Sequence, residues 1–161
     1  FRIPQNLEEK IPDSGLHLVL DDVRDPGNLG TIIRLCDWYG IEHLICSDQT
    51  VDCYNPKVVQ ATMGSLGRVK VRYCDLKIFL ENQKLPIYGA FMDGSSIYKA
   101  ELPTDAILIL GNEGKGISAA IESLANHRIS IPQFGSSTTE SLNVASAGAI
   151  FINTFRERGG R

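Results

Sequence analysis

The sequence predicts an α/β protein with a mainly parallel sheet flanked by helices, and three observations support this fold class. Short runs of β-branched and other apolar residues alternate with segments of helix length, which is typical of βα units. Polar, glycine-containing loops follow three of these runs, as connections at the end of a strand require. Of the 161 residues, 43% are hydrophobic and 22% are charged, which suits one globular domain with a substantial core.

The first predicted βα unit contains the stretch DDVRDPGNLGTIIRLCDWYG. An apolar strand is expected at His17–Asp21, and a proline and a glycine then suit a tight turn. We expect Asn28 to cap a helix over Leu29–Tyr39, and Gly40 to end that helix in a left-handed conformation. Arg34 lies well off the apolar stripe of this helix, so packing alone does not explain it.

The later elements continue the alternation of strands and helices. The runs HLICS, RVKVRY, IYGAF, AILIL and RISI predict five more strands. Their expected bounds are His43–Ser47, Arg68–Tyr73, Ile87–Phe91, Ala106–Leu110 and Arg128–Ile131. The further helices are expected at Pro56–Met63, Leu76–Asn82, Ser118–Leu124 and Leu142–Glu157.

The last predicted helix, SLNVASAGAIFINTFRER, carries apolar residues on two sides. Leu142, Ala145 and Ala149 form one stripe, while larger residues continue round another side. Its run of small residues permits close approach of another backbone. We therefore expect the sheet on one side and a partner subunit on the other; burial of both sides within one monomer is the alternative.

Charge and cysteine usage exclude several classes of protein. A formal charge of −3 and a pI near 5.6 argue against a domain that coats nucleic acid by bulk charge. The four cysteines form no CxxC pair and no metal-ligand spacing, so we expect reduced thiols, no metal and a cytoplasmic location. No apolar run reaches the roughly 20 residues that span a bilayer, so no membrane association is expected.

Common catalytic and nucleotide-binding motifs fit the three polar loops poorly. GNEGKGIS has the wrong glycine spacing for a Walker A loop, and the first βα turn lacks G-x-G-x-x-G. No G-x-S-x-G elbow accompanies His17, His43 or His127, so these histidines are expected to be packed or at the surface. A binding site at this edge is still expected, because ligands of open α/β sheets collect at the carboxyl ends of the strands.

Taken together and in order, the three loops resemble the SpoU-type branch of the SPOUT superfamily of RNA methyltransferases. NLGTIIR is similar to the first motif of that family, LILGNEGKGI to the second and SLNVASAGAI to the third. The resemblance extends from about Leu16 to Phe155. It implies a deep trefoil knot in the C-terminal part, a homodimer, S-adenosylmethionine as cofactor, and methylation of a ribose 2′-hydroxyl in tRNA or rRNA.

The resemblance also implies roles for individual residues. Arg34 would engage the target ribose or its phosphate and help to remove the hydroxyl proton, although an arginine is a reluctant base. Asn28 would position the ribose or hold Arg34, and Glu113 would orient Arg34 or an RNA donor. Ser141 and Asn143 would hydrogen-bond near the hydroxyl. The alternatives are helix capping for the asparagines and Ser141, and a solvated loop carboxylate for Glu113.

The cofactor site implied by the resemblance uses mainly backbone groups. The residues expected there are Gly111, Ile131 and Leu142, with Ala90 beneath them. The third loop, IPQFGSSTTESLN, departs from the family pattern, because Gln133 replaces a methionine and the polar stretch is longer. This departure is expected to alter the wall of the cofactor pocket or the RNA contact.

For the domain organisation, residues 1–12 are expected to be the tail of a linker and residues 13–161 the catalytic domain. Many relatives carry an N-terminal RNA-binding domain, and such a segment would choose the substrate. Two other functions stay open: a non-catalytic RNA-binding or assembly protein that keeps the knotted dimer, and a different α/β nucleotide-binding enzyme.

Overall fold

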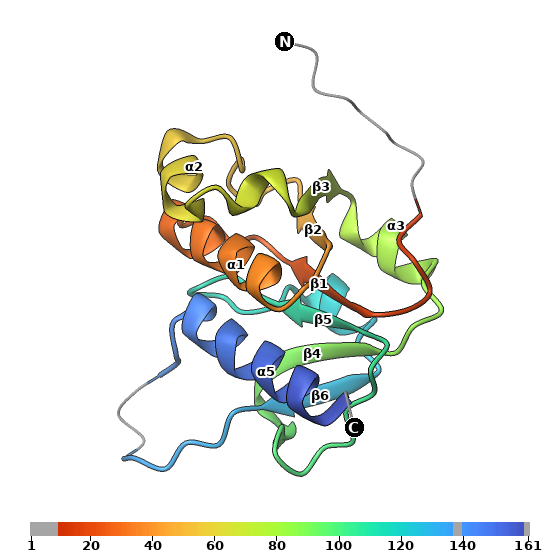
Figure 1. The fold of residues 1–161 in the computed structure, drawn as a ribbon. Helices are drawn as coiled ribbons and strands as arrows, with labels where there is room; N and C mark the ends of the chain where they lie inside the picture. The colour runs from red at the N-terminus through yellow and green to blue at the C-terminus, as the bar shows by residue number, and fades with distance from the viewer. Residues whose placement is uncertain (1–9, 137–139, 160–161) are drawn as a thin grey trace.

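The computed structural model describes residues 10–136 and 140–159 as a three-layer α/β structure (Figure 1). All six strands are parallel and follow the order β3-β2-β1-β5-β4-β6. The strands are β1 (Leu16–Leu20), β2 (His43–Ser47), β3 (Lys70–Cys74), β4 (Ile87–Ser96), β5 (Ala106–Leu110) and β6 (His127–Ser130). The helices are α1 (Pro26–Trp38), α2 (Pro56–Thr62), α3 (Leu76–Glu81), α4 (Ala119–Glu122) and α5 (Val144–Gly159), with a 3-10 turn, η1, at Ser65–Gly67.

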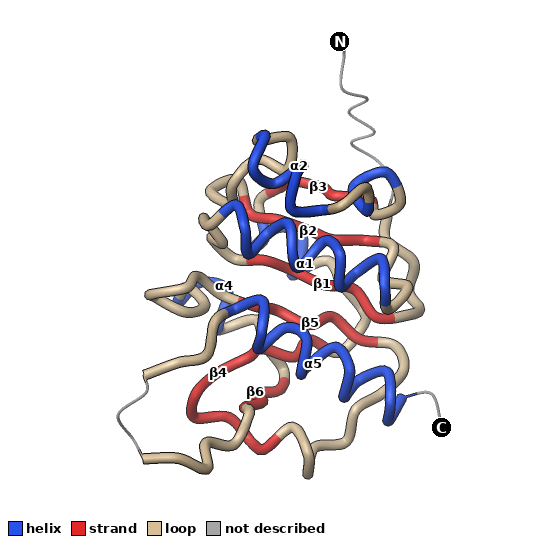
Figure 2. Tube along the Cα trace, turned by 60° about the vertical axis from the view of Figure 1, so that its left-hand side comes forward, coloured by secondary structure: helices blue, strands red, loops and turns tan. Residues whose placement is uncertain are grey.

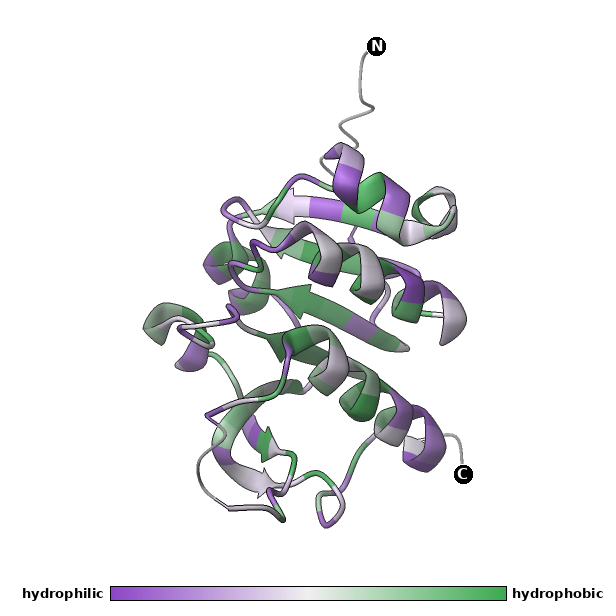
Figure 3. Ribbon diagram, turned by 90° about the vertical axis from the view of Figure 1, so that its left-hand side faces the viewer, coloured by the Kyte–Doolittle hydropathy of each residue, from purple (hydrophilic) through white to green (hydrophobic). Residues whose placement is uncertain are grey.

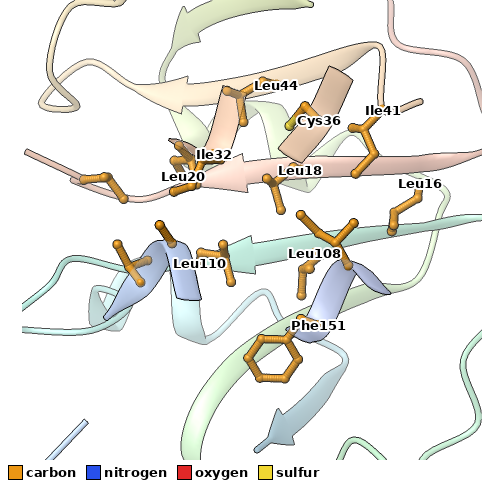
Figure 4. Close-up of a cluster of buried hydrophobic side chains, with 14 of the residues drawn as sticks. Leu16, Leu18, Leu20, Ile32, Cys36, Ile41, Leu44, Leu108, Leu110 and Phe151 are labelled. Carbon is orange, nitrogen blue, oxygen red and sulfur yellow. The ribbon is translucent and has the colours of Figure 1, made fainter. Parts of the chain in front are cut away.

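Helices cover both faces of the sheet because the central strands are apolar on both sides. In β1, Leu18 and Leu20 face the layer of α1, α2 and α5, whereas Val19 faces the layer of α3 and α4. Figure 4 shows the first of these cores, where Leu18 and Leu108 of the two central strands lie between α1 and α5. Figure 3 shows that the central strands are mainly hydrophobic, whereas the helices carry both hydrophobic and hydrophilic residues. A continuous apolar run thus predicts a strand buried on both faces.

The first helix begins three residues earlier than the sequence suggested. Asp25, and not Asn28, is the N-cap: its carboxylate accepts the N–H of Asn28 at 2.8 Å, and Pro26 opens the helix. Proline is well suited to the first helical position, since its fixed φ matches the helix and its missing N–H is not needed. The expectation that Asn28 is the cap is therefore wrong, and the side chain of Asn28 is left free for another role. Gly40 follows the helix at φ +65°, as expected.

The strand β4 is longer than expected and bends. Its first part pairs with β5, whereas its pairing with β6 shifts register between Ala90 and Ser95. Gly94 lies in the bend, and a Cβ there would be 2.6 Å from the backbone carbon of Ile129. The bend therefore needs glycine, and the run IYGAF alone indicated only the straight part of the strand.

The helix α5 packs on the sheet beside α1 (Figure 2). Gly148, Phe151 and Phe155 are buried, but Ser146 is exposed and Ala149 is half-buried. Leu142, expected in one apolar stripe of this helix, lies before its first turn and is 49% exposed. Burial of both sides within the monomer is thus incomplete, and a narrow face of small and polar residues stays accessible.

The expected linker lies mostly at residues 1–9, outside the described part of the chain. Ile11, within the expected linker, is buried with 6% of its surface exposed, in the core layer of α3 and α4. Residues 137–139 of the third polar loop are likewise outside the described part.

Candidate active site at the carboxyl edge of the sheet

Loops that are far apart in the sequence meet where β1, β5 and β6 end. The backbone N–H of Asp21 donates to the carbonyl of Leu110 at 2.9 Å, so the loops after β1 and β5 leave the sheet together. The amide of Asn112 donates to the carbonyl of Asp22 at 2.7 Å, and the buried carboxylate of Asp21 accepts the N–H of Ser118 at 2.7 Å. These bonds fix one loop against the other.

The loop Gly111–Gly116 is held by its own asparagine. The Oδ1 atom of Asn112 accepts the N–H groups of Gly114 and Lys115, both at 2.9 Å, and the backbones of Asn112 and Gly116 form a two-bond bridge. A Cβ on Gly111 would lie 2.3 Å from the backbone carbon of Gly116. Only glycine fits at this position, because the two ends of the loop touch.

Glu113 is turned toward the N-terminus of α1. Its carboxylate accepts the N–H of Asp25 at 3.0 Å and that of Arg24 at 3.3 Å, and the Nδ2 atom of Asn28 lies 3.4 Å from Oε1. A carboxylate is favourable at a helix N-terminus, where backbone N–H groups lack intrahelical acceptors. The alternative of a solvated loop carboxylate is therefore wrong for Glu113.

Asn143 links the third loop to the same cluster. Its Oδ1 atom caps α5 by accepting the N–H groups of Ala145 at 2.9 Å and Ser146 at 3.2 Å, while its Nδ2 atom donates to Oδ1 of Asn28 at 2.9 Å. Helix capping and a place in the cluster thus coexist in one side chain. We call Asn28, Glu113 and Asn143 the amide–carboxylate cluster; each of its amide groups has a defined orientation.

Arg34 lies outside the amide–carboxylate cluster. It is six residues beyond Asn28 in α1, which corresponds to about 9 Å along the axis and about 120° around it. In the described part of the chain, the hydrogen bonds of the Asn28 and Glu113 side chains go to each other, to Asn143 and to the start of α1, and none goes to Arg34. Arg34 is exposed on the outer face of α1, one turn before Trp38, which is 83% exposed.

A cavity of about 730 Å³ opens beside the cluster. All four residues expected to bind the cofactor line it: Ala90, Gly111, Ile131 and Leu142. Glu113 and Ser141 also line the cavity. Glu113 is half-buried there, and Ser141 is exposed. The volume of the cavity is within the range found for small-molecule sites, which are lined mainly by apolar side chains and a few well-placed polar groups.

The cysteines lie away from this cavity and are not poised as nucleophiles. All four are free thiols, and none lines the cavity. Burial raises the pKa of Cys36 to about 12, with a smaller contribution from Asp37, and burial raises the pKa of Cys46 well above its usual value. A raised pKa favours the neutral thiol, which is the less reactive form, in both Cys36 and Cys46.

The histidines are packed or at the surface, as expected. His17 is buried, and its Nε2 atom lies 2.9 Å from the carbonyl oxygens of both Pro12 and Ser14. His127 is exposed and stacks on Tyr88 with ring centroids 4.5 Å apart. Within residues 10–136 and 140–159, no group of three or more potential metal ligands is assembled. No helix in the same residues is long and apolar enough to cross a membrane.

Sequence reasoning missed Asp25 and Asn112, which position the cluster without belonging to it. Asp25 stands directly before Pro26, and an acidic residue before a proline is a recognisable start of a helix. Asn112 follows the glycine at the end of β5, a position where an asparagine side chain can close a turn. Both signals were present in the sequence.

Comparison with known proteins identifies relatives along nearly the whole chain. The model of the SpoU rRNA Methylase family matches residues 15–153. The 23S rRNA (guanosine(2553)-2′-O)-methyltransferase RlmP of Bacillus subtilis is 34% identical over 154 residues, which is 92% of this chain and 61% of that protein.

Two solved structures show the same fold. One, from Porphyromonas gingivalis, is assigned to the TrmH family of RNA methyltransferases; it is 46% identical with a TM-score of 0.85, over 95% of this chain and 63% of that one. The AdoMet-bound rRNA methyltransferase of Sinorhizobium meliloti is 30% identical with a TM-score of 0.83, over 91% of this chain and 57% of that one. The chain thus spans about three fifths of the length of the relatives it matches.

Proposed function

The chain belongs to the SpoU rRNA methylase family, and from that premise we propose that it methylates a ribose 2′-hydroxyl in rRNA or tRNA with S-adenosylmethionine. The SpoU fold implies the trefoil knot expected in the C-terminal part. The observation that carries the proposal is the position of the amide–carboxylate cluster beside the cavity, which is lined by all four expected cofactor residues. A cavity of the size of a small-molecule site and a fixed set of polar groups thus lie side by side, which supports a methyl donor and an acceptor hydroxyl being held together.

The residues of the cavity suit the proposed cofactor. Ala90, Ile131 and Leu142 supply apolar walls for an adenosine, and the tight backbone at Gly111 allows a ligand to approach the main chain closely. When bound, S-adenosylmethionine supplies an electrophilic sulfonium methyl group. The protein then has to hold the acceptor hydroxyl in line with that group and exclude competing positions.

The amide–carboxylate cluster is proposed to place the ribose. The amide of Asn28 is fixed from both sides, by Glu113 and by Asn143, so it presents its groups to the acceptor in one orientation. Ser141, exposed at the cavity, is proposed to hydrogen-bond near the reacting hydroxyl. A cluster held in this way reduces the loss of freedom when substrate binds.

Arg34 is proposed to engage the ribose or its phosphate and to assist removal of the proton. Its exposed guanidinium is open to RNA, but a guanidinium holds its proton too strongly to be a good base. A substrate phosphate that shares the proton would ease this step. From the outer face of α1, the positive charge of Arg34 is therefore proposed to act mainly by contacting the ribose or its phosphate.

A homodimer is proposed to form through the exposed faces of α1 and α5. Trp38 lies on the outer face of α1, and Ser146, Ala149 and Asn153 lie on that of α5, which packs beside it. Small residues on α5 allow a second helix to approach closely.

We also infer a cytoplasmic location, which four free cysteines support.

Calorimetric titration with S-adenosylmethionine and S-adenosylhomocysteine, beside sedimentation analysis, tests the proposal. Binding of both ligands by a dimer is expected, followed by transfer of labelled methyl groups to rRNA or tRNA. A non-catalytic RNA-binding protein is the alternative function; it would bind RNA and form the dimer but neither bind the cofactor nor transfer a methyl group. That result would overturn the enzymatic proposal.

A further inference from the structure

Exposed apolar side chains gather at the mouth of the cavity. Phe134 is 92% exposed, Met92 66% and Leu142 49%, and all three line the cavity. Large apolar side chains of this kind are normally scattered singly over a surface. Three of them around one cavity indicate a surface that binds something flat or apolar.

Met92 stands on the bend of β4, which ionic contacts hold in place. Arg128 of β6 bridges Asp93 and Glu122, each at 2.5 Å, and its guanidinium stacks 3.7 Å from the centre of the Phe91 ring. These contacts tie the residues on both sides of Met92 to β6 and α4. The apolar surface at the mouth is therefore presented by a fixed part of the backbone.

Lys115 provides a positive charge at the same cavity. Among the described lining residues it is the one lysine or arginine, and it is exposed at the tip of the loop Gly111–Gly116. The nearby Arg24 already pairs with Asp22 at 2.6 Å, and the Glu113 carboxylate is occupied by backbone N–H groups. Lys115 is thus available for an anion, although Glu140 also lines the cavity.

We propose that the mouth of this cavity binds one nucleotide of the RNA, with its base stacked on Phe134 and a phosphate contacted by Lys115. The proposal rests on the proposed function and extends it to the substrate. An aromatic ring offers a base a stacking partner regardless of sequence, whereas Lys115 suits a phosphate as a point charge. The walls at Ala90, Gly111, Ile131 and Leu142 stay available for the adenosine of the cofactor, because the contact with the RNA base is assigned to Phe134.

The test compares two single-stranded RNA oligonucleotides of 12 nucleotides, one complete and one with abasic sites at its central positions. Binding is measured by fluorescence anisotropy, with and without S-adenosylhomocysteine, for wild type, Phe134→Ala, Phe134→Tyr and Lys115→Gln. Matched controls are Ile78→Ala and Lys77→Gln, both exposed on α3.

Phe134→Ala is expected to weaken binding of the complete oligonucleotide by about 5-fold to 150-fold. The same substitution should leave binding of the abasic oligonucleotide unchanged. Phe134→Tyr keeps an aromatic ring, so it should bind the complete oligonucleotide more tightly than the abasic one, as the wild type does. Lys115→Gln should weaken both oligonucleotides equally and reduce the salt slope by about 0.7.

An unchanged ratio of complete to abasic binding in Phe134→Ala would overturn the base contact, as would a loss confined to S-adenosylhomocysteine affinity. An unchanged salt slope in Lys115→Gln would overturn the phosphate contact. The binding measurements without S-adenosylhomocysteine do not depend on methyl transfer, so they test the RNA contacts separately from the proposed function. Failure of the proposed function would instead show as wild-type protein that binds RNA but not S-adenosylhomocysteine.

Discussion

Asn143 carries two separable functions, and two substitutions distinguish them. Its Oδ1 atom caps α5, and its Nδ2 atom orients Asn28. Asn143→Ala removes both, whereas Asn143→Asp keeps an acceptor for the cap and removes only the donor. A carboxylate at position 143 accepts hydrogen bonds, so it would favour rotation of the Asn28 amide by about 180°, with Nδ2 of Asn28 toward position 143. The Oδ1 atom of Asn28 would then face the Glu113 carboxylate.

The expected changes in stability follow from these contacts. Loss of an N-cap costs about 1 kcal/mol, and loss of the hydrogen bond to Asn28 costs about 1 kcal/mol more. Asn143→Ala should therefore lower the free energy of unfolding by about 2 kcal/mol, or the Tm by about 4–8 °C for a domain of this size. Asn143→Asp should be near neutral, because a negative charge at a helix N-terminus regains about 0.3–1 kcal/mol.

Activity should respond differently, because both substitutions remove the orientation of Asn28. We expect each to reduce methyl transfer at least about 10-fold, equivalent to about 1.4 kcal/mol in the transition state. Thermal unfolding and transfer of labelled methyl groups to RNA measure the two effects. Gln60→Glu adds the same charge on the exposed surface of α2 and serves as a control. Full activity in Asn143→Asp would refute the role of the Asn143 amide, and wild-type stability in Asn143→Ala would refute the cap.

Three further substitutions test other parts of the structure. Arg34→Ala should abolish methyl transfer with S-adenosylmethionine affinity near wild type, as calorimetry and a transfer assay would show; equal activity would remove Arg34 from the reaction. Ser146→Phe should convert a dimer to a monomer in sedimentation, and an unchanged profile would place the interface elsewhere. Hydrogen bonds from Arg68 and Ser65 lower the pKa of Asp37, so its stabilising effect is present above the unfolded pKa and is lost as pH falls below about 4. Asp37→Asn should reduce stability to urea at pH 7 more than at pH 3, and an equal loss at both pH values would contradict this linkage.

The central strands β1 and β5 were predictable because their side chains alone identify them. Runs such as AILIL in β5 are apolar at every position, and a strand covered on both faces needs no polar alternation. Helix boundaries are harder to predict, since Asp25 and Asn28 are both good caps and only three residues apart. Local preference cannot choose between two such caps; the fixed φ of Pro26 decides in favour of the first.

The order of strands could not be read from the chain. In the sheet, β5 lies between β1 and β4. Along the sequence, β1 and β4 are separated by two other strands and three helices, and β5 comes only after β4. Such an arrangement depends on long-range pairing, for which a single sequence carries no periodic signal. The bend in β4 was hidden for a related reason, because Gly94 is required by the backbone of β6 and not by its neighbours in the chain.

The expected site residues differ in how far the structure brings them together. Asn28, Glu113 and Asn143 meet through direct hydrogen bonds, although 85 and 115 residues separate Asn28 from the other two. Arg34 stands apart because helical geometry turns it away from Asn28, so a shared motif does not guarantee a shared position. The cluster forms where two helices start: the N–H groups at the beginning of α1 attract Glu113, and Asn143 caps α5. The same unpaired N–H groups that need capping thus hold the polar cluster of the site in place, which is why a change at Asn143 should affect both stability and transfer.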